Sequence, residues 1–176
     1  MRQLPSELPG DYTKWNLANN DGWTVAHEAA KAGRLPEGFD RWDLGGDGDK
    51  TVAHVAIEYG RLPEWFDRWD ISNKHGWTAA HSAASCGRLP EGFDRWEMAN
   101  NDGWTVAHQA AKHGHLPKDF SLWFLMDKLG NTVAHTAAEF GNLPNSFELW
   151  DLTNNIGRTV RDVVSSQTTE PRVMLH

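Results

Sequence analysis

Small and apolar residues recur along the chain with the spacing of a short helix. Between Thr24 and Gly33 the sequence reads VAHEAAKA, and its alanines lie at positions i, i+3 and i+4 counted from Ala26. This spacing places small side chains on one face of a helix, where a neighbouring helix can approach closely. Threonine is a favoured N-cap and glycine commonly ends a helix. The pattern therefore predicts a helix over residues 25–32.

A second group of apolar residues follows each predicted helix. After Gly33 come Leu35 and Pro36, and then Phe39 and Trp42, which are three residues apart. Proline suits the first position of a helix, and a three-residue spacing places two rings on one side of it. The pattern predicts a second, shorter helix. The sequence ANNDG that follows Trp15 and Trp96 is rich in turn-forming residues and predicts a polar loop.

The whole pattern repeats every 27 residues without an insertion. A fixed period of this size is typical of a stacked array in which each unit buries its face against the next. Each histidine follows its threonine by three residues, which is the spacing of a capping box. We therefore interpret the threonines, histidines and tryptophans of the period as structural: Thr24, His27, Thr51, His54, Thr78, His81, Thr105, His108, Thr132, His135, Trp42, Trp69, Trp96, Trp123 and Trp150.

The pattern Gly-x-Thr-x-x-His-x-Ala-Ala-x-x-Gly, present at residues 22–33, 76–87 and 103–114, resembles the first helix of the ankyrin repeat. Ankyrin units usually run to about 33 residues and carry Pro-Leu after the threonine, whereas this period is 27 residues long and has Val-Ala or Ala-Ala there. The resemblance implies an all-α fold, an ankyrin-like helix-turn-helix solenoid of about five to six short repeats, with structural histidines.

The period also predicts how the chain is divided. Residues 1–18 match only the second half of a unit and predict an N-terminal half-repeat cap, and residues 19–152 hold the repeats. Residues 153–166 predict a capping repeat, in which Asp162 stands at the histidine position. Residues 167–176 show no period, which marks this tail as a candidate for disorder.

Positions that vary from unit to unit are the candidates for partner binding. The residue between the turn glycine and the threonine is Trp, Lys, Asn or Arg in different units, so it is not a core position. The resemblance implies that this residue lies in a loop finger that faces a partner. The positions before the turn glycine and next to the helix end vary likewise. The candidates at all these positions are Trp23, Lys31, Lys50, Tyr59, His75, Trp77, Trp104, Lys112, His113, Asn131 and Phe140. The alternative is that the three tryptophans only cover neighbouring loops.

Composition narrows the function further. The 176 residues carry a net charge of −7, whereas a general nucleic-acid binder normally shows a basic stripe, so a nucleic-acid partner is not expected. No apolar run has the length of a membrane span, and the N-terminus lacks the apolar stretch of an export signal. A single cysteine, Cys86, fits a reducing compartment. We expect a cytoplasmic protein, or one delivered into a host cytosol.

No catalytic residue, metal or cofactor is predicted. Neighbouring helices in a stack lie about 8–10 Å apart, whereas zinc-bound nitrogens lie about 2 Å from one ion, so equivalent histidines would not easily share a metal. The expected function is a non-catalytic protein–protein interaction module, which could serve as a stand-alone inhibitor, adaptor or effector. The alternative is a small-ligand or glycan binding module that uses exposed tryptophans. Neither the partner's identity nor the oligomeric state is indicated.

Overall fold

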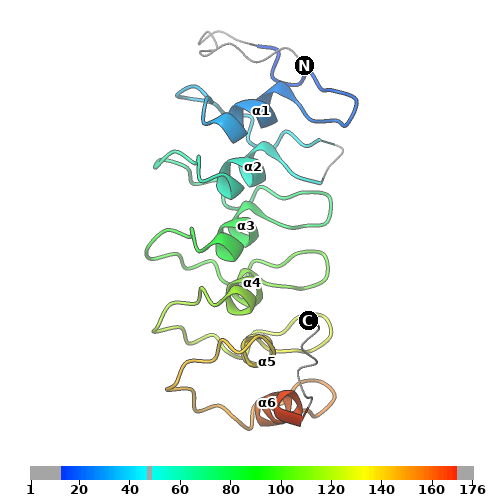
Figure 1. Ribbon diagram of the computed structural model, residues 1–176, viewed down its shortest axis with the longest axis vertical. Coiled ribbons are helices and arrows are strands. Elements are labelled where there is room, and N and C mark those ends of the chain that lie inside the picture. The colour runs from blue at the N-terminus through cyan, green and yellow to red at the C-terminus, as the bar shows by residue number, and fades with distance from the viewer. Residues whose placement is uncertain (1–12, 47–48, 170–176) are drawn as a thin grey trace, which may run out of the picture. The chain divides into compact units, whose positions relative to one another are not determined.

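The computed structural model describes residues 13–46 and 49–169. Within this part of the chain there are six short α-helices and no β-strand, so the fold is all-α (Figure 1). The chain divides into two compact units, Met1–Arg88 and Leu89–His176. The first unit holds α1 (Val25–Ala32), α2 (Val52–Glu58) and α3 (Ala79–Cys86), and the second holds α4 (Val106–His113), α5 (Val133–Glu139) and α6 (Val160–Thr169).

Each helix begins directly after a threonine of the period, and α1 covers the residues predicted for it. The Gly33 backbone has φ +68°, and its N–H bonds to the carbonyls of Ala29 and Ala30 at the end of α1. The left-handed conformation that ends the helix explains the glycine at this position. Helix α6 runs to Thr169, which is beyond the predicted capping repeat. Residues 1–12 of the predicted half-repeat and 170–176 of the predicted tail lie outside the described residues.

Consecutive helices pack against each other within each unit. Helix α2 contacts α1 and α3, and α5 contacts α4 and α6. The contact faces are made of alanine and valine side chains that are almost fully buried, such as Ala53, Ala56 and Val52 in α2. Side chains of this size let neighbouring helices lie close together.

The predicted second helix is not formed. Residues 35–44 instead make two successive turns, closed by the hydrogen bonds Phe39 N–H to Pro36 O (3.1 Å) and Leu44 N–H to Arg41 O (3.2 Å). So short a segment gains too few helical hydrogen bonds to offset the cost of starting a helix. Each repeat is therefore one helix followed by an extended loop. We refer to the loops at 35–42, 62–69, 89–96, 116–123 and 143–150 as the Leu-Pro loops.

The Leu-Pro loops contribute a ladder of Phe and Trp rings to the core. Trp42 packs edge-on between Phe39 and Phe66, with ring centroids 5.2 Å and 5.1 Å away, and only 2% of it is exposed. Trp123 packs in the same way between Phe120 and Phe147 in the second unit. Edge-to-face rings bury large apolar areas. The rings thus supply burial that the missing second helix does not.

Candidate partner-binding surface

The candidate surface lies at the N-termini of the helices, where the capping threonine and the histidine three residues later are hydrogen-bonded to each other. The Thr24 side chain accepts a hydrogen bond from His27 N–H (3.3 Å), and the Nδ1 atom of His27 accepts one from Thr24 N–H (3.2 Å). The Thr24 hydroxyl lies 2.7 Å from the same Nδ1. This reciprocal pairing is a capping box in which histidine takes the place of the usual Glu or Gln.

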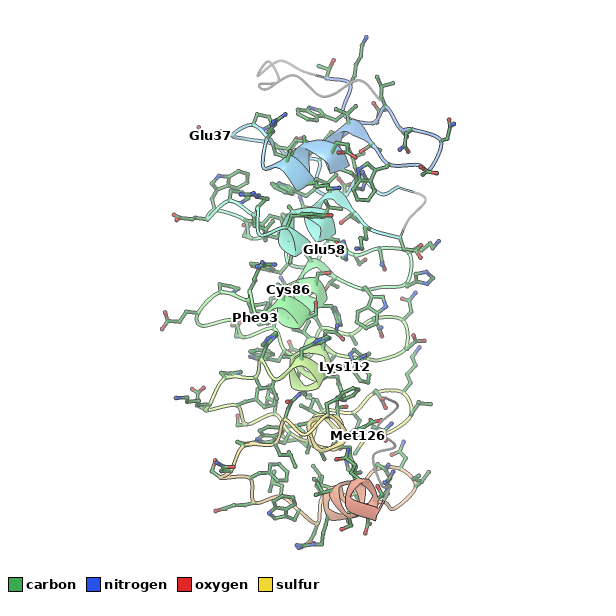
Figure 2. All side chains as sticks on the ribbon, viewed as in Figure 1. Glu37, Glu58, Cys86, Phe93, Lys112 and Met126 are labelled. Carbon is green, nitrogen blue, oxygen red and sulfur yellow. The ribbon has the colours of Figure 1, made fainter. Side chains whose placement is uncertain are left out.

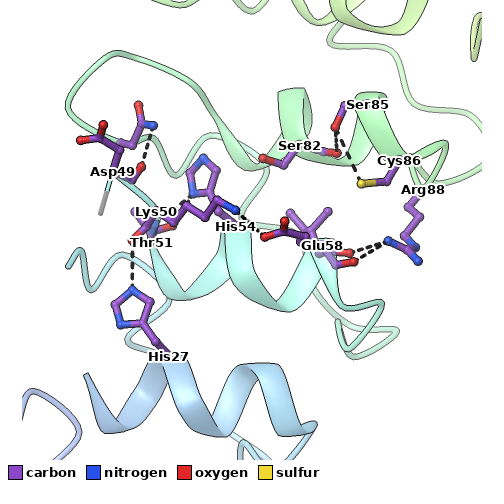
Figure 3. Close-up of polar contacts among 12 residues, drawn as sticks. His27, Asp49, Lys50, Thr51, His54, Glu58, Ser82, Ser85, Cys86 and Arg88 are labelled. Atoms are coloured by element: carbon purple, nitrogen blue, oxygen red, sulfur yellow. Dashed lines mark hydrogen bonds and ion pairs between the residues drawn. The ribbon is translucent and has the colours of Figure 1, made fainter. Parts of the chain in front are cut away.

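The other ring nitrogen of four capping histidines, His27, His54, His108 and His135, reaches the next repeat within its unit. Nε2 of His27 lies 3.0 Å from the carbonyl oxygen of Lys50 (Figure 3). Nε2 of His54 lies 2.9 Å from the carbonyl oxygen of Trp77. Since a carbonyl can only accept, Nε2 carries the proton and Nδ1 is the acceptor. The same bond joins His108 to Asn131 O and His135 to Arg158 O. Each of these histidines therefore holds the backbone of the residue that varies between repeats.

Burial affects the titration of these rings. Burial lowers the pKa of His27, His54 and His108 below the ordinary value of histidine, while the hydrogen bond to the next repeat's carbonyl partly raises it. A protonated ring would turn Nδ1 from an acceptor into a donor facing the threonine N–H. The capping box is thus a property of the neutral histidine.

We call the loop before each capping threonine the finger, and an asparagine or aspartate shapes five of the six; the finger before Thr51 has Gly46 at that position. In residues 18–24 the Asn19 side-chain oxygen accepts hydrogen bonds from Asp21 N–H (3.0 Å) and Trp23 N–H (2.9 Å). An isolated bridge between Ala18 and Thr24 closes this finger. Asn73, Asn100, Asp127 and Asn154 repeat these bonds at the same position. Such local side-chain bonds favour one turn geometry.

A second contact between repeats caps the helix ends, and the sequence did not predict it. The Arg88 guanidinium donates to the carbonyls of Ile57 (2.8 Å) and Glu58 (3.0 Å) at the end of α2 (Figure 3). Asn142 does the same for Ala111 and Lys112 at the end of α4, with both distances 2.9 Å. These bonds satisfy carbonyls that a helix end leaves free. The only available signal was a polar residue directly after each helix-ending glycine.

The candidate binding residues fall into an exposed and a half-buried group. Exposed residues are Lys31, Lys50, Tyr59, His75, Lys112, His113 and Phe140, whereas Trp23, Trp77, Trp104 and Asn131 are half-buried. In the first unit the Lys31 ammonium lies over the Tyr59 ring, and in the second that of Lys112 lies over Phe140. Figure 2 shows Lys112 on α4. The structure thus brings these candidates together pairwise across adjacent repeats.

The half-buried tryptophans lie against the capping histidines. The ring centroids of Trp23 and His27 are 4.9 Å apart, and those of Trp104 and His108 are 5.1 Å apart. The Trp104 indole also donates to the Gln109 side chain at 3.0 Å. These indoles therefore cover the helix starts while one part of each ring stays accessible.

A groove runs between fingers and helices in the second unit. It encloses about 470 Å³, and its walls include Trp104, Asn131, Glu139, Arg158 and Gln167. Two of the predicted binding residues, Trp104 and Asn131, therefore share one groove with charges of both signs. In the first unit, the corresponding finger positions carry ion pairs: Lys50 with Glu58, Lys74 with Asp49, and His75 with Asp49.

Nothing among the described residues points to a metal or a membrane. No three His, Cys, Asp or Glu side chains there are grouped so that they could hold a metal ion. No described helix has the length and apolar character needed to cross a bilayer. The chain matches no protein-family model, and no curated protein sequence matches it. The resemblance to ankyrin repeats therefore remains an interpretation of the repeated residues.

Proposed function

We propose that the chain is a non-catalytic protein–protein interaction module that binds its partner through the fingers and the exposed helix positions. One observation carries the proposal. Within both units, a histidine of one repeat binds the backbone carbonyl of the next repeat's finger at residues whose side chains differ: Lys50, Trp77, Asn131 and Arg158. A rigid backbone that presents variable side chains is suited to recognising a protein surface.

We also propose that the repeats are turns of an ankyrin-like solenoid. The repeated Thr-x-x-His-x-Ala-Ala helix, the finger closed by a bridge, and the contacts between consecutive helices support this architecture. Because the 27-residue register runs unbroken from Thr24 to Thr159, the proposal applies to both units. The single cysteine favours a reducing, cytosolic setting, and the acidic composition disfavours a nucleic-acid partner.

The side chains favour a protein over a small ligand. The exposed candidates are spread over successive repeats and include paired cations and rings, such as Lys112 with Phe140. A glycan or quaternary ammonium ligand would require open indole faces. The rings of Trp23, Trp77 and Trp104 each pack against a histidine ring, which leaves less of the indole open to a ligand.

The test compares two triple variants in the second unit. The first, Lys112→Glu, Phe140→Ala and Arg158→Glu, changes the exposed helix and finger positions. The matched control, Lys118→Glu, Phe124→Ala and Arg161→Glu, makes the same three changes at exposed positions elsewhere in that unit. A partner captured by the unmodified chain from its native cell would be purified and titrated against each protein by calorimetry.

We expect the first variant to lose binding and the control to keep it, with similar melting temperatures for both. Alanine and charge-reversal changes at a binding centre often cost more than about 2 kcal/mol, whereas changes outside it cost little. A partner that binds the first variant as tightly as the unmodified chain would refute the proposed surface. Capture of no saturable partner would refute the proposed function.

A further inference from the structure

Two equivalent recesses lie between Leu-Pro loops, one in each unit. The recess of the first unit lies between the loops at 35–42 and 62–69 and encloses about 320 Å³. The recess of the second unit lies between the loops at 89–96 and 116–123 and encloses about 620 Å³. In the second unit, the Leu-Pro loops lie on the side of the helices away from the fingers (Figure 1). This recess is therefore separate from the finger surface.

A tryptophan partly fills the smaller recess. Trp65 lines it, and its ring centroid lies 6.2 Å from that of Trp42. Beneath it, Trp42 and Phe39 are only 2% and 5% exposed. Arg61 and Glu37 also line this recess, so its walls carry one charge of each sign.

The larger recess differs from the smaller one in the exposure of its rings and in the charge of its walls. Asp119 takes the position of Trp65 two 27-residue periods later, and the rings of Phe93 and Trp96 are half-buried where Phe39 and Trp42 are buried. The planes of Phe93 and Trp96 are perpendicular, with centroids 5.3 Å apart. Glu91 adds a second carboxylate to the walls. Among the described residues that line this recess, none is lysine or arginine, and His115 stands where Arg61 stands in the first unit.

We propose that this recess receives an arginine side chain of a protein partner. A guanidinium plane can stack on the Trp96 or Phe93 ring while its N–H groups donate to the carboxylates of Glu91 and Asp119. The apolar stem of the arginine would cover the remaining ring surface. Arginine suits such a site better than lysine, because the guanidinium is planar and less strongly hydrated. The proposal concerns a second contact site and does not depend on the finger surface.

The test uses the full chain and a single amino acid derivative as the probe. N-acetyl-arginine amide is titrated while the indole N–H signals are followed by NMR, with the Trp96 signal assigned from a Trp96→Phe variant. N-acetyl-citrulline amide has the same shape without the charge and is the matched ligand control. We expect a saturable shift of the Trp96 signal with the arginine derivative alone. Equal shifts with citrulline, or equal affinity for N-acetyl-lysine amide, would overturn the arginine assignment.

Substitutions locate the binding in the recess. Asp119→Trp copies the first unit's filled recess, and we expect it to abolish the saturable shift. Asp119→Asn and Glu91→Gln should each weaken the affinity roughly two- to fivefold, which is the range for exposed ion pairs. Asp151→Asn removes an exposed carboxylate elsewhere in the unit and should have no effect. If Asp119→Trp fails to fold, the two amide variants decide alone, and unchanged affinity in both would refute the proposal.

Discussion

The inner repeats and the last repeat start their helices with different side chains. In α2, Nδ1 of His54 accepts the Thr51 N–H, and Nε2 donates to the Trp77 carbonyl of the next finger. In α6, the Asp162 carboxylate accepts the Thr159 N–H at 2.8 Å and makes no bond to a further repeat among the described residues. An aspartate carboxylate can cap a helix, but it has no N–H group that could donate a hydrogen bond to a further repeat. Histidine thus serves both the cap and the contact with the next finger, whereas Asp162 serves the cap alone among the described residues.

The aromatic ladder differs in the same way. Trp123 lies between Phe120 and Phe147, whereas Trp150 packs against Phe147 alone among the described rings. Among the described rings, Trp150 at the end of the ladder therefore has one ring contact, where Trp123 has two and Trp42 has three. Stability in such an array depends on the contacts between neighbouring repeats. Four predictions test how far inner and terminal positions differ.

The largest effect is expected from the ladder. Trp42→Ala should lower the free energy of unfolding by about 3–5 kcal/mol, because it empties a fully buried position between two rings. Trp150→Ala should cost clearly less, since that ring is half-buried and has one ring neighbour. Urea unfolding followed by circular dichroism measures both. Equal losses would show that the end of the ladder packs as tightly as its middle.

The next effect concerns the capping histidines. His54→Ala should cost about 2–4 kcal/mol, because it removes a cap, leaves the buried Thr51 N–H without a partner and takes one of two hydrogen bonds from the Trp77 carbonyl. Lys50→Ala is the control: only the Lys50 backbone accepts the His27 bond, so we expect a loss below about 1 kcal/mol. A His54→Ala protein as stable as the unmodified chain would refute the structural role of the histidine.

The third prediction concerns pH. Burial lowers the folded-state pKa of His27, His54 and His108 below the unfolded value of about 6.5, so the unfolded chain binds more protons. Stability should fall as pH drops below about 6.5, by up to about 1.4 kcal/mol per pH unit for each histidine. Urea unfolding between pH 8 and about pH 5 measures the slope.

A control sharpens the pH comparison with the last repeat. The hydrogen bond from Thr159 N–H lowers the pKa of Asp162, so this cap should persist after the histidine caps are lost. The His54→Ala variant should show a smaller slope than the unmodified chain over the same range. A slope that does not change on removal of His54 would mean that other groups cause the pH dependence.

The smallest effect is expected at the last repeat. Asp162→His should leave the free energy of unfolding nearly unchanged, because residues 13–46 and 49–169 place no finger carbonyl where the new Nε2 atom could bind it. The position is exposed, so the exchange leaves no cavity. Calorimetric melting of the two proteins checks this. A marked stabilisation would indicate an acceptor for that nitrogen beyond the described residues.

The repeated residues predicted the helices well because their signals are local. Thr24 and Gly33 set the two ends of α1 through hydrogen bonds that are made within about one helical turn of each end. The Leu-Pro loops were predicted wrongly as helices, because the spacing of Phe39 and Trp42 also suits successive turns that aim both rings at the ladder. The capping role of Arg88 was missed, since its acceptors lie 30 and 31 residues earlier.

The sequence by itself determined the period, the helix boundaries and the positions whose side chains vary, since each depends on residue types at short, fixed spacings. Only the tertiary structure decided which repeats share hydrogen bonds, which indoles lie against a histidine, and where a recess between loops stays open. Trp65 and Asp119 hold equivalent positions, yet Trp65 packs against a buried Trp42, whereas Trp96 in the recess of Asp119 is half-buried. That difference depends on the size of the side chain that the neighbouring repeat contributes, which the residues of one repeat alone do not reveal.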